Sequence, residues 1–130
     1  MNPTNPKIKD KIYNYLDSIC HIEDKVITIN TTVFPNIDNI FGVRNISFHH
    51  WATDRVGETY GIIHPDTTME WFKNGLIHRD NNKPAMTYPD GTMEWWVNGL
   101  RHRDNDEPAV ILADGTSYCY EYGEIVHNNN

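Results

Sequence analysis

The sequence predicts a mainly β (all-β) protein: an antiparallel meander of about three 24-residue β-hairpin repeats plus a truncated fourth, preceded by an N-terminal α-helix and strand. Two observations lead to this prediction. Residues 70–80 recur 24 positions later as residues 94–104, with Glu, Trp, Asn-Gly-Leu and His-Arg-Asp unchanged. Dipeptides that favour tight turns separate short segments of strand-forming residues in both copies. A fixed period of this length is the signature of a repeat architecture.

The same period sets the expected domain organisation. Residues 46–69 align with the two clear copies as a diverged first copy, and residues 118–127 align as a truncated last one. We therefore expect an N-terminal helix and strand cap over 1–45, a repeat sheet over 46–127 and a disordered tail at 128–130. Terminal copies of a stacked array differ from central ones because they must present a polar outer face or be covered.

Composition and charge exclude several classes of function. The 130 residues suffice for one domain with a core of its own. The formal net charge is −7, from 18 acidic and 11 basic residues, and no run of Lys or Arg exists, which argues against nucleic-acid binding. No charged-then-apolar leader opens the chain and no apolar run is long enough to span a membrane, so we expect a cytoplasmic protein without a membrane span.

The first expected element is a helix over Pro6–Ile19. Asn5 can cap it, Pro6 suits its first position, and apolar residues follow at helical spacing: Ile8, Ile12, Tyr15, Leu16 and Ile19. We expect this stripe to pack on the sheet, with partner binding as the alternative. A strand is expected over residues 25–34, which are rich in β-branched side chains, and a loop over 35–45.

Residues 48–51 contain His49 and His50, with Asp54 close by in the sequence. On the strand expected here, adjacent side chains point to opposite faces, so the two imidazoles would not share a metal ion. We expect no metal site and no cofactor.

Turn chemistry organises each repeat. Asn-Gly and Asp-Gly pairs are expected to adopt positive φ at both central positions of tight hairpins, and they occupy 74–75, 90–91, 98–99 and 114–115. Pro108 cannot donate a hydrogen bond to a central ladder, so residues 104–108 are expected to form a loop.

Strand alternation then assigns two faces to the sheet. One face is expected to form the core, with an aromatic residue in all four copies: Phe48, Phe72, Trp96 and Tyr120. The opposite face carries Met69, Trp71, Met93 and Trp95. Large side chains on a second face are either covered, here by the N-terminal helix, or exposed to bind a protein or a glycan.

The His-Arg-Asp segments are expected to have a structural role. Equivalent atoms of successive copies would lie about 10 Å apart if each copy adds two strands, so copies of one residue cannot share a metal ion. We expect Arg79 and Arg103 to reach acidic residues such as Glu70, Glu94 or Asp104, while His78 and His102 satisfy backbone groups of the loops.

Residues 94–102, followed by Asp-Gly-Thr at 114–116, resemble a MORN-type repeat over roughly residues 46–127. The resemblance implies successive β-hairpins in an elongated sheet. The His-Arg-Asp and Pro-Ala variant is similar to MORN-like arrays of large DNA viruses of amoebae and of some bacteria, which implies a viral source as one option, in the host cytoplasm or the virion. MORN proteins are usually scaffolds, so the resemblance implies no catalytic residues.

The expected function is therefore a non-enzymatic module for protein interaction or scaffolding, with an unidentified protein partner. One alternative is a carbohydrate-binding module that uses Trp71 and Trp95 as stacking platforms. A small hydrolase is the second alternative, but no serine or cysteine stands in a recognisable nucleophile elbow. Unpaired sheet edges would also permit self-association.

Overall fold

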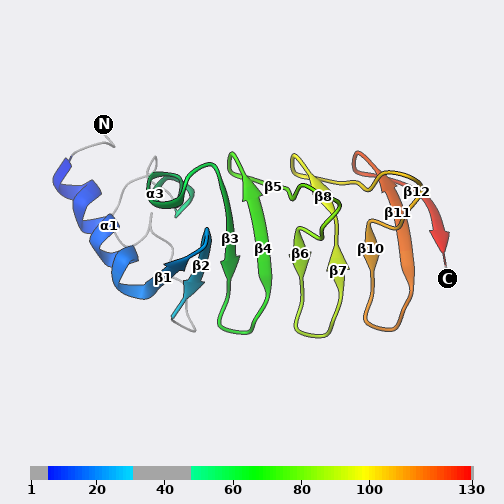
Figure 1. Ribbon diagram of the computed structural model, residues 1–130, viewed down its shortest axis with the longest axis horizontal. Helices are drawn as coiled ribbons and strands as arrows, with labels where there is room; N and C mark the ends of the chain where they lie inside the picture. Colours follow the sequence, from blue (N-terminus) through cyan, green and yellow to red (C-terminus); the bar gives the residue numbers. More distant parts are fainter. Residues whose placement is uncertain (1–5, 31–47, 130) are drawn as a thin grey trace.

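The computed structural model describes residues 6–30 and 48–129. The chain is mainly β and elongated, with its strands side by side along the long axis and both described helices at the N-terminal end (Figure 1). The elements are α1 (Pro6–Ile19), β1 (Cys20–Glu23), β2 (Val26–Ile29), α3 (Phe48–Val56), β3 (Thr59–Ile63), β4 (Met69–Lys73), β5 (Leu76–Ile77), β6 (Met86–Thr87), β7 (Met93–Glu94), β8 (Trp96–Val97), β9 (Leu100–Arg101), β10 (Val110–Ile111), β11 (Ser117–Glu121) and β12 (Glu124–Asn129).

Ten of the strands form one sheet in which neighbours along the chain are usually neighbours in space. The order is β1-β2-β3-β4-β6-β7-β10-β11-β12, and β5 pairs with β4. Strands β2 and β3 are parallel, whereas the other pairs in this sheet are antiparallel. Strands β8 and β9 form a separate two-stranded sheet. The predicted mainly β fold with a largely antiparallel sheet is confirmed.

The helix predicted over Pro6–Ile19 is confirmed with the same bounds. The predicted Asn-Gly turns are confirmed as well, because both residues of each pair have positive φ. The angles are 53° and 79° at Asn74 and Gly75, and 48° and 82° at Asn98 and Gly99. The Asp-Gly pairs differ from the prediction, since only the glycine has positive φ. There the Asp90 carboxylate accepts the Thr92 N–H at 2.9 Å, and Tyr88, Pro89, Asp90 and Gly91 form a wider turn.

The prediction for the diverged first copy was wrong in its first half. Phe48 begins helix α3 and does not sit on a strand, so it is not part of a strand column with Phe72. His49 and His50 are likewise helical. The 24-residue alignment placed Phe48 under Phe72, but here tertiary packing of a helix on β3 prevails over the strand register.

Two further predictions concern the edges of the described chain. The predicted strand over 25–34 is described only as β2, Val26–Ile29, while the rest of it and the predicted loop over 35–45 lie largely outside the described residues. The predicted disordered tail at 128–130 was wrong for 128 and 129, which belong to β12. Strand β12 pairs along the full length of β11, with one register shift between Cys119 and Tyr120.

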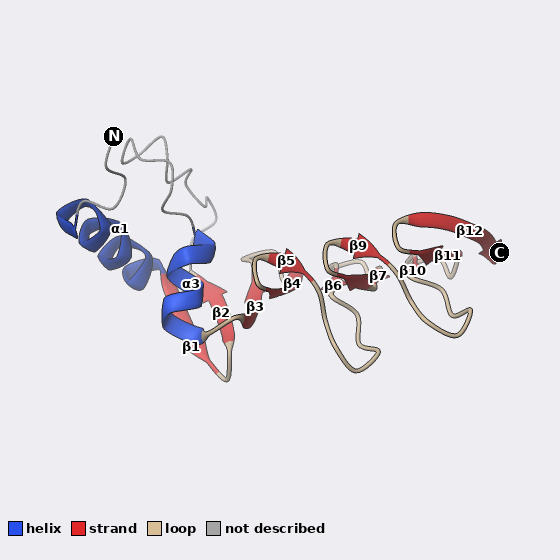
Figure 2. Cartoon of the chain, turned by 90° about the horizontal axis from the view of Figure 1, so that it is seen from above, coloured by secondary structure: helices blue, strands red, loops and turns tan. Residues whose placement is uncertain are grey.

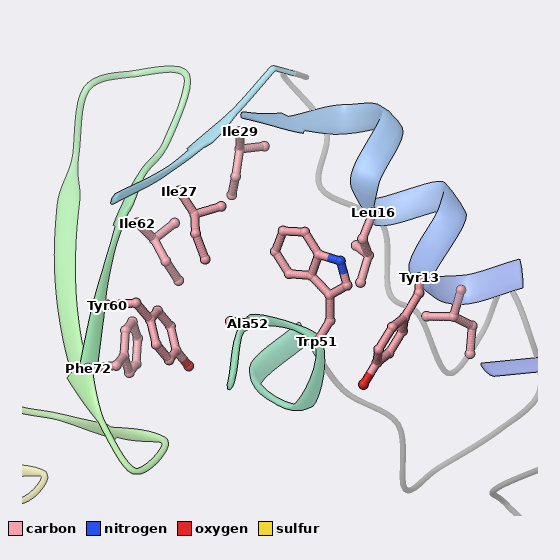
Figure 3. Packing of buried hydrophobic residues seen from close by; sticks show 10 residues of the cluster. Tyr13, Leu16, Ile27, Ile29, Trp51, Ala52, Tyr60, Ile62 and Phe72 are labelled. Carbon is pink, nitrogen blue, oxygen red and sulfur yellow. The ribbon is translucent and has the colours of Figure 1, made fainter. Parts of the chain in front are cut away.

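The principal core lies at the N-terminal end, where the two helices pack on the sheet. Its buried members come from α1, β2, α3, β3 and β4: Ile12, Tyr13, Leu16, Ile27, Ile29, Trp51, Ala52, Tyr60, Ile62 and Phe72 (Figure 3). Trp51, Tyr60 and Leu16 are completely buried. Tyr60 stacks on Phe72 with ring centroids 5.6 Å apart.

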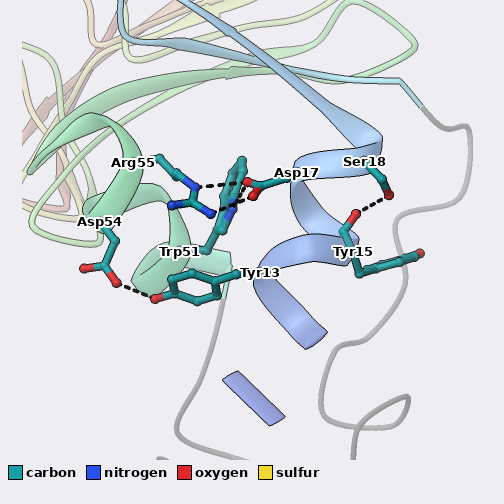
Figure 4. Close-up of polar contacts among 7 residues, drawn as sticks. All are labelled: Tyr13, Tyr15, Asp17, Ser18, Trp51, Asp54 and Arg55. Atoms are coloured by element: carbon teal, nitrogen blue, oxygen red, sulfur yellow. Dashed lines mark hydrogen bonds and ion pairs between the residues drawn. The ribbon is translucent and has the colours of Figure 1, made fainter. Parts of the chain in front are cut away.

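Polar contacts tie α1 to α3 at the margin of this core (Figure 4). Asp17 accepts from the Trp51 indole at 2.9 Å and pairs with Arg55 at 2.6 Å, and the Arg55 contacts hold the pKa of that carboxyl below its ordinary value. The Tyr13 hydroxyl donates to Asp54 at 2.6 Å. Two independent side-chain links thus fix the orientation of α1 on α3.

The Tyr13 hydroxyl makes stability sensitive to alkaline pH. Burial, followed by the hydrogen bond to Asp54, raises the pKa of Tyr13 from 10.0 to about 12. The folded state therefore favours the protonated phenol, so the contribution is fully present below pH 10 and is lost between pH 10 and about 12. We expect urea unfolding at pH 9 and pH 11.5 to show a smaller loss of stability in Tyr13→Phe than in the wild type. Equal losses in the two proteins would contradict this role for the phenol.

The sheet has two differently covered faces. Tyr60, Ile62 and Phe72 point toward the helices, and we call this side, which continues through Glu94 and Trp96, the helix-side face. The other side, which carries Trp71 and Trp95, is the loop-side face. Seen from above, β5 and β9 lie on one side of the main sheet. The loops that connect β5 to β6 and β9 to β10 extend from the opposite side (Figure 2).

This arrangement corrects the predicted core. Of the predicted aromatic column, Phe72 is buried, whereas Trp96 and Tyr120 are only half-buried. Their neighbours on the loop-side face are more deeply buried, with Trp95 7% exposed and Cys119 1% exposed. On the helix-side face of the later copies the smaller Glu94 and Val110 are buried as well. Beyond β4 no helix among the described residues lies on the helix-side face, so the better covered side of the sheet changes along the array.

Candidate binding surface

The loop-side face alternates small and large side chains across the strands. Trp71 pairs with Gly61 on β3, and a methyl group at Gly61 would come within 3.0 Å of the indole. The fully buried Ala85 and Ala109 follow between the later strands. The order across the sheet is Gly61, Trp71, Ala85, Trp95, Ala109 and Cys119. Each indole therefore needs a small neighbour on which to lie.

Two loops, residues 78–84 and 102–108, cover this face. The Arg79 guanidinium carbon lies 4.3 Å from the centroid of the Trp71 ring, and that of Arg103 lies 3.8 Å from Trp95. Each guanidinium also donates to a proline carbonyl of its own loop, Pro84 at 3.2 Å and Pro108 at 3.1 Å. Cation–π stacking thus fastens each loop over the tryptophan of its own copy.

The histidines connect each copy to the next. His78 Nδ1 accepts the Asn98 N–H at 3.0 Å, and His102 Nδ1 accepts the Tyr122 N–H at 3.1 Å. Because Nδ1 is an acceptor, the ring proton sits on Nε2, which donates to the aspartate two residues on at 2.8 Å and 2.7 Å respectively. Both ring nitrogens of each buried histidine are therefore engaged. The predicted backbone role of His78 and His102 is confirmed.

Arg103 does pair with an acidic residue, as predicted, but not with any of the three that the prediction named. Arg103 pairs with Glu107 at 2.7 Å, and Glu94 pairs with Arg101 at 3.2 Å. Glu94 points to the helix-side face, away from both loops, so strand alternation prevents the contact that the linear sequence suggested.

The predicted binding residues divide into two groups. Trp95 is buried beneath Arg103 and donates from Nε1 to the Asn82 carbonyl at 3.1 Å, so neither ring face is open as a stacking platform. Trp71, Met69 and Met93 are half-buried. The N-terminal helix does not cover the indoles, because α1 packs against α3 and β1, and its buried side chains belong to the core on the helix-side face. The loops at residues 78–84 and 102–108 cover the indoles instead. Contacts between a loop and a strand that are distant in the sequence leave no periodic signal in it.

A groove of about 270 Å3 lies between the two loops. Polar groups of both loops line it together with Trp95, Trp96 and Val97 of the sheet. His78 and His102 also line it, but both ring nitrogens of each are already bonded, so the groove offers Asn, Asp and backbone groups to a ligand and no unengaged imidazole nitrogen from these two residues.

The helix-side face carries a second surface that the sequence analysis did not identify as a site. Trp96 and Tyr88 lie next to the buried carboxylate of Glu94, and Tyr118 and Tyr120 are on the same face of the sheet. All four aromatic residues are half-buried; we call these five residues and Arg101 the aromatic patch. The Trp96 indole donates to Glu94 at 2.8 Å. The pKa of Tyr88 is raised by burial and by the nearby Glu94.

Arg101 links the members of the aromatic patch. Its guanidinium lies 5.1 Å from the Trp96 ring and 5.5 Å from the Tyr120 ring, and it pairs with Glu94. Within the described chain, the Arg101 Nε atom is buried without a hydrogen-bond partner. The aromatic residues at 24-residue spacing carry this signal, although strand alternation alone predicts them as core.

Within the described part of the chain, no three His, Cys, Asp or Glu side chains are grouped closely enough to hold a metal ion. Neither described helix has the length and apolar character needed to cross a bilayer. Comparison with protein-family models, curated proteins and solved structures finds no match for this chain.

Proposed function

We propose that the protein is a non-enzymatic MORN-like repeat module that binds a partner protein through the aromatic patch. The observation that carries the proposal is the change of cover along the helix-side face. The chain's own helices pack with buried residues of β2, β3 and β4 on this face, whereas the aromatic residues of the patch farther along stay half-exposed. Both described helices lie at the N-terminal end of the molecule (Figure 1). Trp, Tyr and Arg are the residues most enriched in the energetic centres of protein interfaces.

The repeat interpretation is supported by contacts that recur 24 residues apart. The His78 and His102 bonds, the two stacked arginines and the bonds from Gly99 to Ile77 O and from Gly123 to Arg101 O all follow this spacing. We interpret the chain as about three hairpin repeats and a shortened fourth, with the N-terminal helix and strand as a cap.

The non-enzymatic part of the proposal rests on the engaged histidines. A hydrolytic site built on His78 or His102 would need an accessible ring nitrogen as its general base, but both ring nitrogens of each histidine already have partners. A scaffold needs only a rigid surface, which these bonds provide.

A site-specific crosslinking experiment tests the proposal. A photoreactive phenylalanine analogue is placed at Tyr118 in the aromatic patch or at Thr87 on the loop-side face, and each protein is irradiated in an extract of its native cell. We expect a discrete protein adduct from position 118 that is absent from position 87. The identified partner should then bind the purified Trp96→Ala variant at least tenfold more weakly than the wild type. Adducts of equal yield from both positions, or adducts to this chain alone, would refute a partner site at the patch.

A further inference from the structure

The two copies of the loop-side site differ in how completely their polar groups are satisfied. In the later copy, Asn82 of the preceding loop bonds twice. Its carbonyl accepts from Trp95 Nε1 at 3.1 Å, and its side-chain oxygen accepts from Arg103 Nε at 2.9 Å. The Glu107 carboxylate completes the set with its ion pair to Arg103 at 2.7 Å. The molecule itself thus supplies a carbonyl, an amide oxygen and a carboxylate to this Trp-Arg pair.

The earlier copy lacks all three groups. The Nε1 atom of Trp71 is buried and has no hydrogen-bond partner among the described residues. The residue 24 positions before Glu107 is Lys83, which places a second cation where Arg79 would need a carboxylate. Glu58 aligns with Asn82, but its carbonyl accepts from Asn74 N–H at 2.9 Å. No ion pair within the described chain joins Arg79 to an acid.

A cavity of about 240 Å3 opens beside these groups. It is lined by Thr59, Trp71, His78, Arg79, Asp80, Asn81 and Lys83. Asp80 is already engaged, since it lies 3.6 Å from Lys73 Nζ and accepts from His78. Burial lowers the pKa of Arg79 below its ordinary value, which reflects a cation whose desolvation no carboxylate offsets.

We propose that this cavity binds an acidic peptide segment of a partner protein, with a main-chain carbonyl on Trp71 Nε1 and a carboxylate between Arg79 and Lys83. The groups that fill the equivalent place around Trp95 are a main-chain carbonyl, an amide oxygen and a carboxylate, all supplied by polypeptide, which favours a peptide over a simple anion. Trp71 then acts as a hydrogen-bond donor and not as the stacking platform that its aromatic ring suggested. The site lies on the opposite face from the aromatic patch, so it is independent of the surface proposed above.

Fluorescence anisotropy with a defined probe tests the proposal. The probe is the N-acetylated, C-amidated peptide Gly-Asn-Asn-Glu-Glu-Gly carrying a fluorophore, and its control has Gln in place of both Glu. We expect the control to bind roughly 10- to 100-fold more weakly, as loss of a charge-assisted contact implies. Inorganic phosphate should not displace the probe at equal concentration. Equal binding of probe and control, or efficient displacement by phosphate, would overturn the peptide site.

Lys83→Glu is the most informative variant because it converts the earlier copy to the pattern of the later one. The new carboxylate should pair with Arg79 as Glu107 pairs with Arg103, so we expect a higher melting temperature and at least a tenfold loss of probe binding. Lys25→Glu, an equal change of charge at an exposed turn, should leave binding unchanged. Equal losses from both variants would mean that only long-range charge attracts the probe, and no loss from Lys83→Glu would remove the site.

Trp71→Phe tests the indole donor separately. It keeps a ring under Arg79 but removes the Nε1 hydrogen, so we expect roughly fivefold weaker binding of the probe, the usual effect of one neutral hydrogen bond. Trp96→Ala in the aromatic patch should leave probe binding at the wild-type level, which separates failure of this site from failure of the partner surface. Unchanged binding by Trp71→Phe would contradict the proposed carbonyl contact.

Discussion

Replacement of Trp95 by alanine is expected to lower the free energy of unfolding by about 3–5 kcal/mol, the cost of deleting a buried tryptophan. The indole is 7% exposed, lies between Ala85 and Ala109, and carries both the Arg103 guanidinium and a hydrogen bond to Asn82. Its loss would leave a cavity beneath both loops. Urea titration followed by circular dichroism, fitted with a common m value, measures the change.

Trp96→Ala is the matched control, one residue away on the opposite face. That side chain is only half-buried, so we expect a loss of about 1–2 kcal/mol, within the usual range for partly buried positions. The pair of variants distinguishes the two face assignments. A larger loss from Trp96→Ala than from Trp95→Ala would restore the aromatic column as the core.

Replacement of Trp51 by alanine should produce a loss of similar size, about 3–5 kcal/mol, at the other end of the molecule. Trp51 is completely buried, lies 5.3 Å from Phe48 between ring centroids, and bonds Asp17 across to α1. Thr53→Ala, at an exposed position of the same helix, should change stability by no more than about 0.5 kcal/mol.

Amide hydrogen exchange should show where the Trp51→Ala protein loosens. In a stacked array each unit contacts only its neighbours, so we expect faster exchange in α1 and β3 and nearly unchanged protection in β10 and β11. A uniform rise in exchange across the sheet would show that the helical core and the later copies unfold as one unit.

The sequence predicted best where local chemistry decides the structure. The α1 helix has a proline at its first position and a helical stripe, and the Asn-Gly turns at 74–75 and 98–99 have a backbone requirement that few other pairs meet. Hydrophobic period and turn type are written into neighbouring residues, so both could be recognised without tertiary information.

The prediction failed where contacts with segments far away in the sequence determine which side chain is buried or which element forms. The adjacent Trp95 and Trp96 give no local sign of which face is buried, and the answer comes from a loop that returns over one of them. Phe48 fits the period of the strands yet begins α3, because α3 packs its Trp51 and Ala52 into the core formed with α1 and β3. Around the cavity of Arg79 and Lys83, the described chain does not supply the carbonyl, amide oxygen and carboxylate that surround Trp95 and Arg103. This difference appears only when the two copies are compared in space.

The strands run across the long axis of the molecule, with the helices at one end and β12 at the other (Figure 1). A pulling force applied between the two ends would therefore break the hydrogen bonds between neighbouring strands one after another. It would not break all the bonds of a strand pair at the same moment. Each 24-residue copy that opened would release about 80 Å of chain. Under tension we expect the described sheet to lengthen in steps, one copy at a time.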